Sequence, residues 1–175
     1  MTKSLFTAAA AASLALLAAG AAQADTLAKI KSSGAVTMGV RESSGALSYT
    51  LGDGKYAGFH VEICQRVLAD VQKQLGLAKL DIKYVPVTSQ NRIPLVQNGT
   101  VDIECGSTTN NAARQRDVAF AVTTYVEEVR IAVKANSGIT SIAQLAGKNV
   151  ATTTGTTSVQ HLRRHERGAN VNFNE

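Results

Sequence analysis

From residue 25 onward, the apolar positions switch repeatedly between a period of two and a period of three to four. A short helix over 27–32 that stops at Gly34 is followed by an apolar run from Val36 to Val40, which predicts a buried strand. The next apolar stripe predicts a helix that ends at Gly76, and its members are Val61, Cys64, Val67, Leu68, Val71 and Leu75. Alternation of strands with helices is typical of an α/β fold.

Turn signals join these predicted elements. The glycine-rich stretch 45–58, around a turn at 51–54, predicts a hairpin. A strand over 80–85 follows the long helix, and Ser89 stands where an N-cap would open a short helix through Val96. Another strand is predicted over 101–105. The first half of the chain is therefore expected to form one α/β unit.

The second half predicts fewer elements. A helix-like stretch covers 112–117, and a longer helix follows Thr154–Ser158 and extends through Arg167. The other expected elements are strands over 118–122, 129–133, 150–152 and 171–175 and a helix over 139–146. These cannot cover both faces of a second sheet, so we expect the chain to be a fragment of a longer protein.

The first 24 residues have the pattern of an export signal. Lys3 is followed by an apolar run over 5–19, and Ala22-Gln23-Ala24 is a small-x-small cleavage site. The run is shorter than the roughly 20 residues that span a bilayer, which disfavours a membrane anchor. We expect cleavage after Ala24 and a periplasmic or extracellular protein.

Charge and composition exclude several classes of protein. The net charge of +5 contains no block of five like charges, and there is no Trp and only 5% aromatic residues. Together with export, these features disfavour nucleic acid as a partner.

Two polar loops follow predicted strands. The stretch 106–111 contains no apolar residue, and 154–158 repeats its chemistry. Open α/β sheets bind ligands at the carboxyl ends of their strands, and backbone N–H groups at helix starts favour anions. Simple capping by the hydroxyls is the alternative interpretation. Neither loop has a nucleotide-binding glycine motif.

Three arginines, Arg41, Arg92 and Arg114, stand near the predicted carboxyl ends of strands. A guanidinium group can hold a carboxylate with two parallel hydrogen bonds, so these positions suit a small anionic ligand. Solvated surface arginines are the alternative interpretation.

The remaining reactive side chains predict no metal site and no catalytic residue. His161 and His165 are four residues apart, but Leu162 stands where a zinc protease needs Glu, and basic neighbours disfavour a cation. His60 has no evident partner, and no nucleophile motif is present. Cys64 and Cys105 are consistent with a disulfide, with two separate buried thiols, or with a partner for Cys105 elsewhere in a longer chain.

The most specific stretches are Thr88 to Thr100, TSQNRIPLVQNGT, and Glu104 to Asn111, ECGSTTNN. With 39–44, GVRESS, and 154–158, TGTTS, they resemble the glutamate/aspartate-binding branch of the family 3 periplasmic solute-binding proteins, the receptors of amino-acid ABC transporters. The resemblance covers residues 25–175.

The resemblance implies a two-lobed periplasmic-binding-protein fold of type II in which the ligand is trapped between lobes by hinge closure. The first lobe, 25–125, would be nearly complete, and the second, 126–175, partial. Arg114, Thr109 and the Ser107 backbone would hold the ligand's α-carboxylate. The acidic side chain would bind Arg41, Ser89 and Arg92, and Thr157 would contribute from across the cleft. The residue that binds the α-ammonium would lie beyond Glu175.

The expected function is that of a monomeric receptor without a cofactor, which captures L-glutamate or L-aspartate and delivers it to an inner-membrane ABC permease. An exported small-acid dehydratase of the same fold is the main alternative, and the sensor domain of a signalling receptor is another. The polar loops supply arginines and hydroxyls rather than a catalytic acid or base, which favours the receptor.

Overall fold

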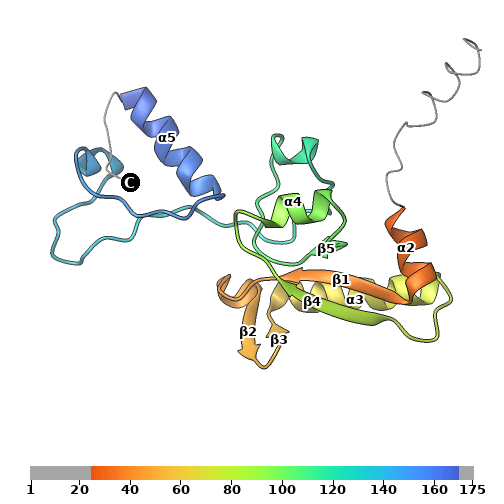
Figure 1. Cartoon of the computed structure of the whole chain (residues 1–175). Coiled ribbons are helices and arrows are strands. Elements are labelled where there is room, and N and C mark those ends of the chain that lie inside the picture. The colour runs from red at the N-terminus through yellow and green to blue at the C-terminus, as the bar shows by residue number, and fades with distance from the viewer. Residues whose placement is uncertain (1–24, 170–175) are drawn as a thin grey trace, which may run out of the picture.

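The computed structural model describes residues 25–169, which form a larger part built around a sheet and a smaller part that contains the C-terminal helix (Figure 1). The predicted export signal over 1–24 and the predicted strand over 171–175 lie outside the described residues. No described helix is long and apolar enough to cross a membrane.

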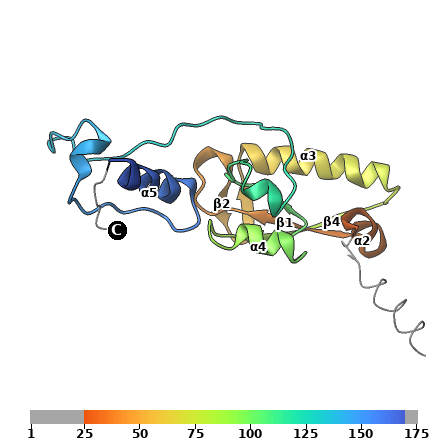
Figure 2. The same ribbon diagram turned by 90° about the horizontal axis from the view of Figure 1, so that it is seen from above.

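Three parallel strands in the order β4–β1–β5 form the central sheet: β4 is Asp81–Pro86, β1 is Ala35–Val40 and β5 is Ile103–Glu104. Helix α3, Phe59–Gln74, connects β1 to β4, and helix α4, Arg92–Gln97, connects β4 to β5. The two connections run in opposite directions across the sheet, so right-handed crossovers place the two helices on opposite faces. Figure 2 shows α3 on one side of the strands and α4, with α2, on the other.

The core lies between β1 and α3. Strand β1 buries Val36, Met38 and Val40, and a disulfide joins Cys64 of α3 to Cys105, directly after β5. The predicted stripe on α3 is confirmed for its buried members, Val61, Cys64 and Leu68, while Val71 and Leu75 pack at the edge of the core. The prediction is wrong for Val67, which is 47% exposed because it lies beside the stripe rather than within it.

Helix α2, Thr26–Ser33, has a capping residue at each end. The Asp25 carboxylate accepts hydrogen bonds from the backbone N–H groups of Leu27 and Ala28, and Gly34 ends the helix at φ 65°. Lys29 then reaches Asp102, 2.7 Å away, and so ties this helix to the residue that precedes β5.

The predicted hairpin is also present. Strands β2, Tyr49–Gly52, and β3, Lys55–Ala57, are antiparallel, and the turn between them places Asp53 and Gly54 at positive φ. A short 3₁₀ helix, η2, over Gly45–Leu47 leads into it.

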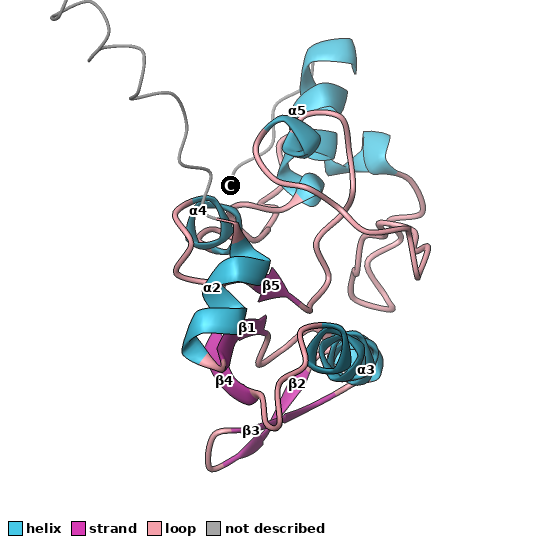
Figure 3. Cartoon of the chain, turned by 90° about the vertical axis from the view of Figure 1, so that its right-hand side faces the viewer, coloured by secondary structure: helices cyan, strands magenta, loops and turns pink. Residues whose placement is uncertain are grey.

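The second half of the chain contains less regular structure than the sequence predicts (Figure 3). Its helices are the 3₁₀ turns η3, Arg114–Arg116, and η4, Ile142–Leu145, and the α-helix α5, Thr157–Ala169. In place of the helix predicted over 139–146, the structure has the single turn η4. A capping box between Ser141 and Gln144 begins this turn. Leu145 and Leu162 form a small separate core.

The strands predicted over 118–122, 129–133 and 150–152 do not form in the described residues. A strand needs a partner for its backbone hydrogen bonds, and the described part of the chain offers none here. Several of their apolar side chains remain exposed: Val122 is 85% exposed, Val129 54% and Ile131 43%.

Candidate functional site

The three parallel strands direct their carboxyl ends to one edge of the sheet, and the polar segments leave from there. Arg41 follows β1, Ser89 follows β4, and Ser107 follows β5. Parallel pairing therefore brings together residues that are far apart in the sequence.

Arg41 is held by three neighbours. Its Nε donates to Ser44 Oγ at 3.1 Å, its Nη1 to the Val87 carbonyl at 2.8 Å, and its Nη2 to Ser89 Oγ at 3.1 Å. Ser44 Oγ also lies 2.9 Å from Ser107 Oγ, so a continuous chain of hydroxyls and a guanidinium group links the ends of all three strands.

Ser89 does not cap α4, contrary to the sequence-based prediction. The helix begins at Arg92, and Thr88 and Asn91 hold the preceding turn: Asn91 Oδ1 accepts from the Thr88 N–H at 2.7 Å, and Thr88 Oγ1 accepts from the Asn91 N–H at 3.2 Å. Ser89 Oγ is thereby left to accept from Arg41. The hydroxyl is part of the site rather than of the helix.

Arg92 is the first residue of α4 and is only 4% exposed. Its Nε and Nη1 atoms are buried and have no hydrogen-bond partner. Burial lowers the pKa of Arg92 to about 10; nearby Glu104 opposes this shift, and Arg114 and Arg41 add to it. The group remains a cation at neutral pH. A buried cation with two unpaired donors is costly, and an anionic ligand would satisfy it.

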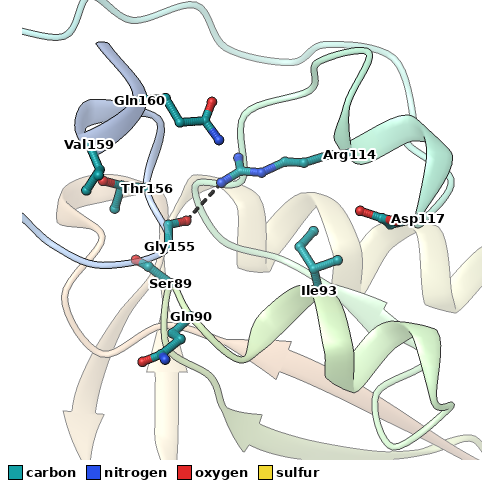
Figure 4. Close-up of a pocket in the computed structure, with 9 residues that line it drawn as sticks. All are labelled: Ser89, Gln90, Ile93, Arg114, Asp117, Gly155, Thr156, Val159 and Gln160. Atoms are coloured by element: carbon teal, nitrogen blue, oxygen red, sulfur yellow. Dashed lines mark hydrogen bonds between the residues drawn. The ribbon is translucent and has the colours of Figure 1, made fainter. Parts of the chain in front are cut away.

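Arg114 opens η3, as part of the polar loop after β5. Asn111 Oδ1 accepts from its backbone N–H, and its Nη1 donates to the Thr109 carbonyl at 3.1 Å. Its Nη2 donates to the carbonyl of Gly155 at 3.0 Å, which belongs to the loop before α5 (Figure 4). Burial lowers the pKa of Arg114 below its usual value. This one side chain thus connects the two parts of the molecule.

The approach of the two parts depends on Gly155. Its φ is 80°, and a Cβ atom there would lie 2.5 Å from the Ser89 carbonyl oxygen. Figure 4 shows the resulting cavity, of about 340 Å³, between the start of α5 and the loop before α4. Its lining residues are Ser89, Gln90, Ile93, Arg114, Asp117, Gly155, Thr156, Val159 and Gln160. A volume of this size suits a small molecule.

A second cavity, of about 620 Å³, adjoins the first at Ile93. Arg92, Ser107 and Thr109 line it, together with residues 118–127. Arg41 and Thr157 line neither cavity: Arg41 is hydrogen-bonded to Ser89 of the first cavity's lining, and Thr157 is the first residue of α5, next to Thr156. Of the predicted site residues, the structure therefore groups all except Thr157 around the strand ends.

Sequence reasoning did not assign three residues that belong to this region. Ser44 and Glu104 lie within the stretches that carry the resemblance, but nothing in their local pattern marked them as part of the site. His60, for which the sequence suggested no partner, has two: its Nδ1 is 2.5 Å from the Gly106 carbonyl, and its Nε2 is 2.8 Å from Thr124 Oγ1. A carbonyl only accepts, so Nδ1 carries a proton.

The described residues contain no group of three or more His, Cys, Asp or Glu side chains that could hold a metal ion. Within the described helix α5, His161 is exposed, whereas Leu162 is buried against the small second core. The chemistry of the region is that of cationic and hydroxyl donors gathered around a cavity.

An α/β sheet whose strand ends face a second part across a cavity lined by cationic and hydroxyl donors is characteristic of the two-lobed solute-binding proteins. The chain belongs to the bacterial extracellular solute-binding proteins, family 3, whose family model matches residues 36–173.

Among curated relatives, the chain is 49% identical over 140 residues to the L-glutamate/L-aspartate-binding protein of Pseudomonas aeruginosa, covering 79% of this chain and 46% of that protein. It is 45% identical over 150 residues to the glutamate/aspartate import solute-binding protein of Escherichia coli K12, covering 81% of this chain and 50% of that protein. The chain thus spans about half the length of these relatives.

Solved structures agree on the fold. One is an ancestral amino acid-binding protein, a precursor of cyclohexadienyl dehydratase. The match covers 80% of this chain and 60% of that protein, with a TM-score of 0.66 and 27% identity. A solute receptor for L-cysteine of Neisseria gonorrhoeae matches 84% of this chain and 57% of its own with a TM-score of 0.62 and 23% identity. The predicted fold class, a two-lobed type II fold with a partial second lobe, is confirmed, and the curated relatives are binding proteins rather than enzymes.

Proposed function

We propose that the protein carrying this chain is a periplasmic solute-binding protein that captures L-glutamate or L-aspartate for an ABC transporter. The observation that carries this proposal is the buried guanidinium group of Arg92, whose Nε and Nη1 lack partners beside the Arg41–Ser89 pair. A carboxylate accepts several hydrogen bonds and carries the opposite charge, so it matches these donors. The names of the two curated relatives agree with this ligand class.

The roles proposed for the site residues are those that the family resemblance implies. Arg92, Arg41 and Ser89 bind the acidic side chain of the ligand. Arg114 and Thr109, with the Ser107 backbone, bind its α-carboxylate. In this structure Arg114 Nη2 donates to the Gly155 carbonyl, so ligand binding replaces one acceptor oxygen with another. Thr157 adds donors from the start of α5, where the helix dipole favours an anion.

The boundaries and location of the protein complete the proposal. Residues 1–24 are a signal peptide that is removed after Ala24, residues 25–125 form the first lobe, and residues 126–175 begin the second. The exported protein acts as a monomer in the periplasm and docks on an inner-membrane ABC permease. Nucleic acid is not a partner.

The test is a thermal-shift screen of the full-length gene product that carries this chain against the twenty amino acids. A ligand that binds only the folded state raises the melting temperature in proportion to its occupancy and affinity. We expect a clear rise with L-glutamate and L-aspartate and little change with the others. The largest rise with an amino acid that has an uncharged side chain would contradict the proposal.

A further inference from the structure

Glu104 places a carboxylate inside the arginine cluster. It is the last residue of β5, and its Oε2 accepts a hydrogen bond from Thr108 Oγ1 at 2.7 Å. Its Oε1 is buried without a hydrogen-bond partner. The next residue, Cys105, is fixed by the disulfide to Cys64, so the backbone that carries Glu104 is anchored to α3.

The Glu104 carboxyl group and the Arg41 side chain both lie close against Gly106. A Cβ atom at Gly106 would overlap both Glu104 Oε1 and Arg41 Cγ. Glycine at position 106 therefore leaves space for both the carboxyl group and the Arg41 side chain. Glu104, Arg92, Ser107 and Thr109 also line the same cavity, so Glu104 faces the space next to the donors assigned to the ligand.

Four ionisable groups interact electrostatically with the Glu104 carboxyl. They come from different elements: Arg92 opens α4, Arg41 follows β1, His60 lies in the first turn of α3, and Arg114 opens η3. Burial raises the pKa of the Glu104 carboxyl, whereas the Thr108 hydroxyl and the charges of Arg92, Arg41 and His60 favour its ionised form. Arg92 and Arg41, which favour the ionised form of Glu104, are therefore also the cations proposed to bind the ligand.

We propose that Glu104 takes up a proton when an acidic amino acid binds, so that binding of the ligand is coupled to binding of a proton. The ligand's side-chain carboxylate compensates Arg92 and Arg41, and it adds a negative charge beside Glu104. Both changes disfavour a second buried anion. A proton from solvent then adds to Oε1, the oxygen without a partner, while Oε2 continues to accept from Thr108.

This inference rests on the proposed function, and the full-length gene product tests both. L-glutamate is titrated calorimetrically between pH 5 and pH 8 in buffers that differ in their ionisation enthalpy. The dependence of the observed heat on the buffer gives the number of protons taken up. We expect uptake of more than zero and at most one proton, with a maximum inside this pH range, and an affinity that weakens as pH rises above that maximum.

Two variants and a control test whether Glu104 is the group that takes up the proton. Glu104→Gln keeps the size of the side chain but cannot ionise, so its proton uptake should fall to near zero. Thr108→Val removes the hydroxyl that favours the ionised form, so the uptake maximum should shift to higher pH. Glu62→Gln, an exposed glutamate on α3, should behave as the wild type does.

The outcomes separate the two claims. Saturable binding of L-glutamate without proton uptake at any pH tested would overturn the inference alone, as would undiminished uptake in Glu104→Gln. No saturable binding of either acidic amino acid to the wild type would overturn the proposed function and the inference with it.

Discussion

Arg41, Arg92 and Arg114 carry the same charge and lie at the same edge of the sheet, but their guanidinium groups differ in what they contact. Arg41 donates to Ser44, Val87 and Ser89, whereas Arg92 has two buried donors without partners. Arg114 instead bridges to the loop before α5. The three guanidinium groups therefore differ in the contacts that they already make without ligand, and their substitution should have different consequences.

Arg92→Ala should weaken acidic ligands selectively, while Arg114→Ala should weaken every amino-acid ligand alike. Arg92 is assigned to the carboxylate that only acidic ligands carry, and Arg114 to the one that all carry. Loss of one partner of a buried charge pair costs roughly 2–5 kcal/mol, or about 30-fold or more in Kd. Calorimetry with L-glutamate and L-glutamine measures both profiles.

Arg116→Ala is the matched control, because Arg116 lies in the same 3₁₀ turn as Arg114 but is exposed. It should leave both affinities unchanged. Identical loss profiles for Arg92→Ala and Arg114→Ala would show that the two roles are wrongly assigned.

Glu104 also predicts a pH dependence of the ligand-free protein. Its pKa is raised on folding, so the folded state holds this proton more tightly than the unfolded state, in which Glu titrates near 4.3. The contribution of Glu104 to the free energy of unfolding is therefore lost as pH rises from about 4.3 through the raised pKa. Urea unfolding of wild type and Glu104→Gln should show a difference that grows in favour of the variant over this range. A difference that does not change with pH would contradict the shift.

The arginines were predictable from the sequence, and Glu104 was not. Arg41, Arg92 and Arg114 each stand just after a predicted strand or in the polar segment that follows one, and the ends of parallel strands share an edge. A glutamate at the end of a short strand has no comparable signal, because which side of the strand end it occupies depends on register. The strand β5 forms over only two residues, so periodicity could not supply that register.

At the scale of elements, the accuracy of prediction depends on whether an element is stabilised locally. Helix α2, the hairpin and α3 have caps, turns or a buried stripe within their own residues, and all three were predicted. The strands over 118–122 and 129–133 have the right apolar residues but need a distant partner for their backbone. No described segment pairs with them, so they remain extended loops.

The loop before α5 gives an element-scale prediction. Gly155→Ala should weaken ligand binding while leaving the first lobe folded, because the added Cβ would meet the backbone of Ser89 and Gln90 and push the loop away. Gly147→Ala is a matched control: Gly147 has φ 68°, similar to the 80° of Gly155, but a Cβ there meets nothing within 4 Å. Both variants carry the same type of backbone strain. Equal effects on the affinity for L-glutamate would show that the contact with Ser89 is irrelevant.

The disulfide gives a second prediction at this scale. Cys64 and Cys105 are 41 positions apart in the sequence, and a cross-link of that span lowers the entropy of the unfolded chain by the equivalent of about 4 kcal/mol. Reduction should lower the free energy of unfolding of the first lobe by about that amount, as measured by denaturation with and without a reductant. The Cys64→Ala/Cys105→Ala variant should be insensitive to the reductant. An unchanged unfolding midpoint in reduced wild type would argue against the bond.

At the scale of the whole molecule, the two parts are unequally built. The first has a disulfide-linked core between β1 and α3, whereas the second rests on the contact between Leu145 and Leu162 with three partly buried neighbours. The sequence predicted this imbalance, because the elements expected in 126–175 are too few to cover both faces of a sheet. It could not show how the lobes meet, since the Arg114–Gly155 bond joins residues 41 positions apart.

Residues 25–175 expressed alone should show an ordered first lobe and weak protection of the later segments against hydrogen exchange. The amides of 118–133 have no strand pairing within the described residues, and terminal segments with few packing partners open readily. Addition of L-glutamate should stabilise this shortened chain little, because a partly built cleft binds weakly. Protection extending evenly through α5, with a large ligand-induced rise in melting temperature, would contradict this picture.

The central claim, that the arginine cluster selects an acidic side chain, is tested most directly by comparing L-glutamate with L-glutamine in the full-length gene product. The two ligands have nearly the same shape and differ in the charge of the side-chain group that Arg92 and Arg41 are proposed to bind. Isothermal calorimetry at neutral pH should show tight binding of L-glutamate and binding of L-glutamine that is weaker by roughly 30-fold or more, since an uncharged side chain leaves buried cations under-compensated. Equal affinities for the two ligands would contradict the claim.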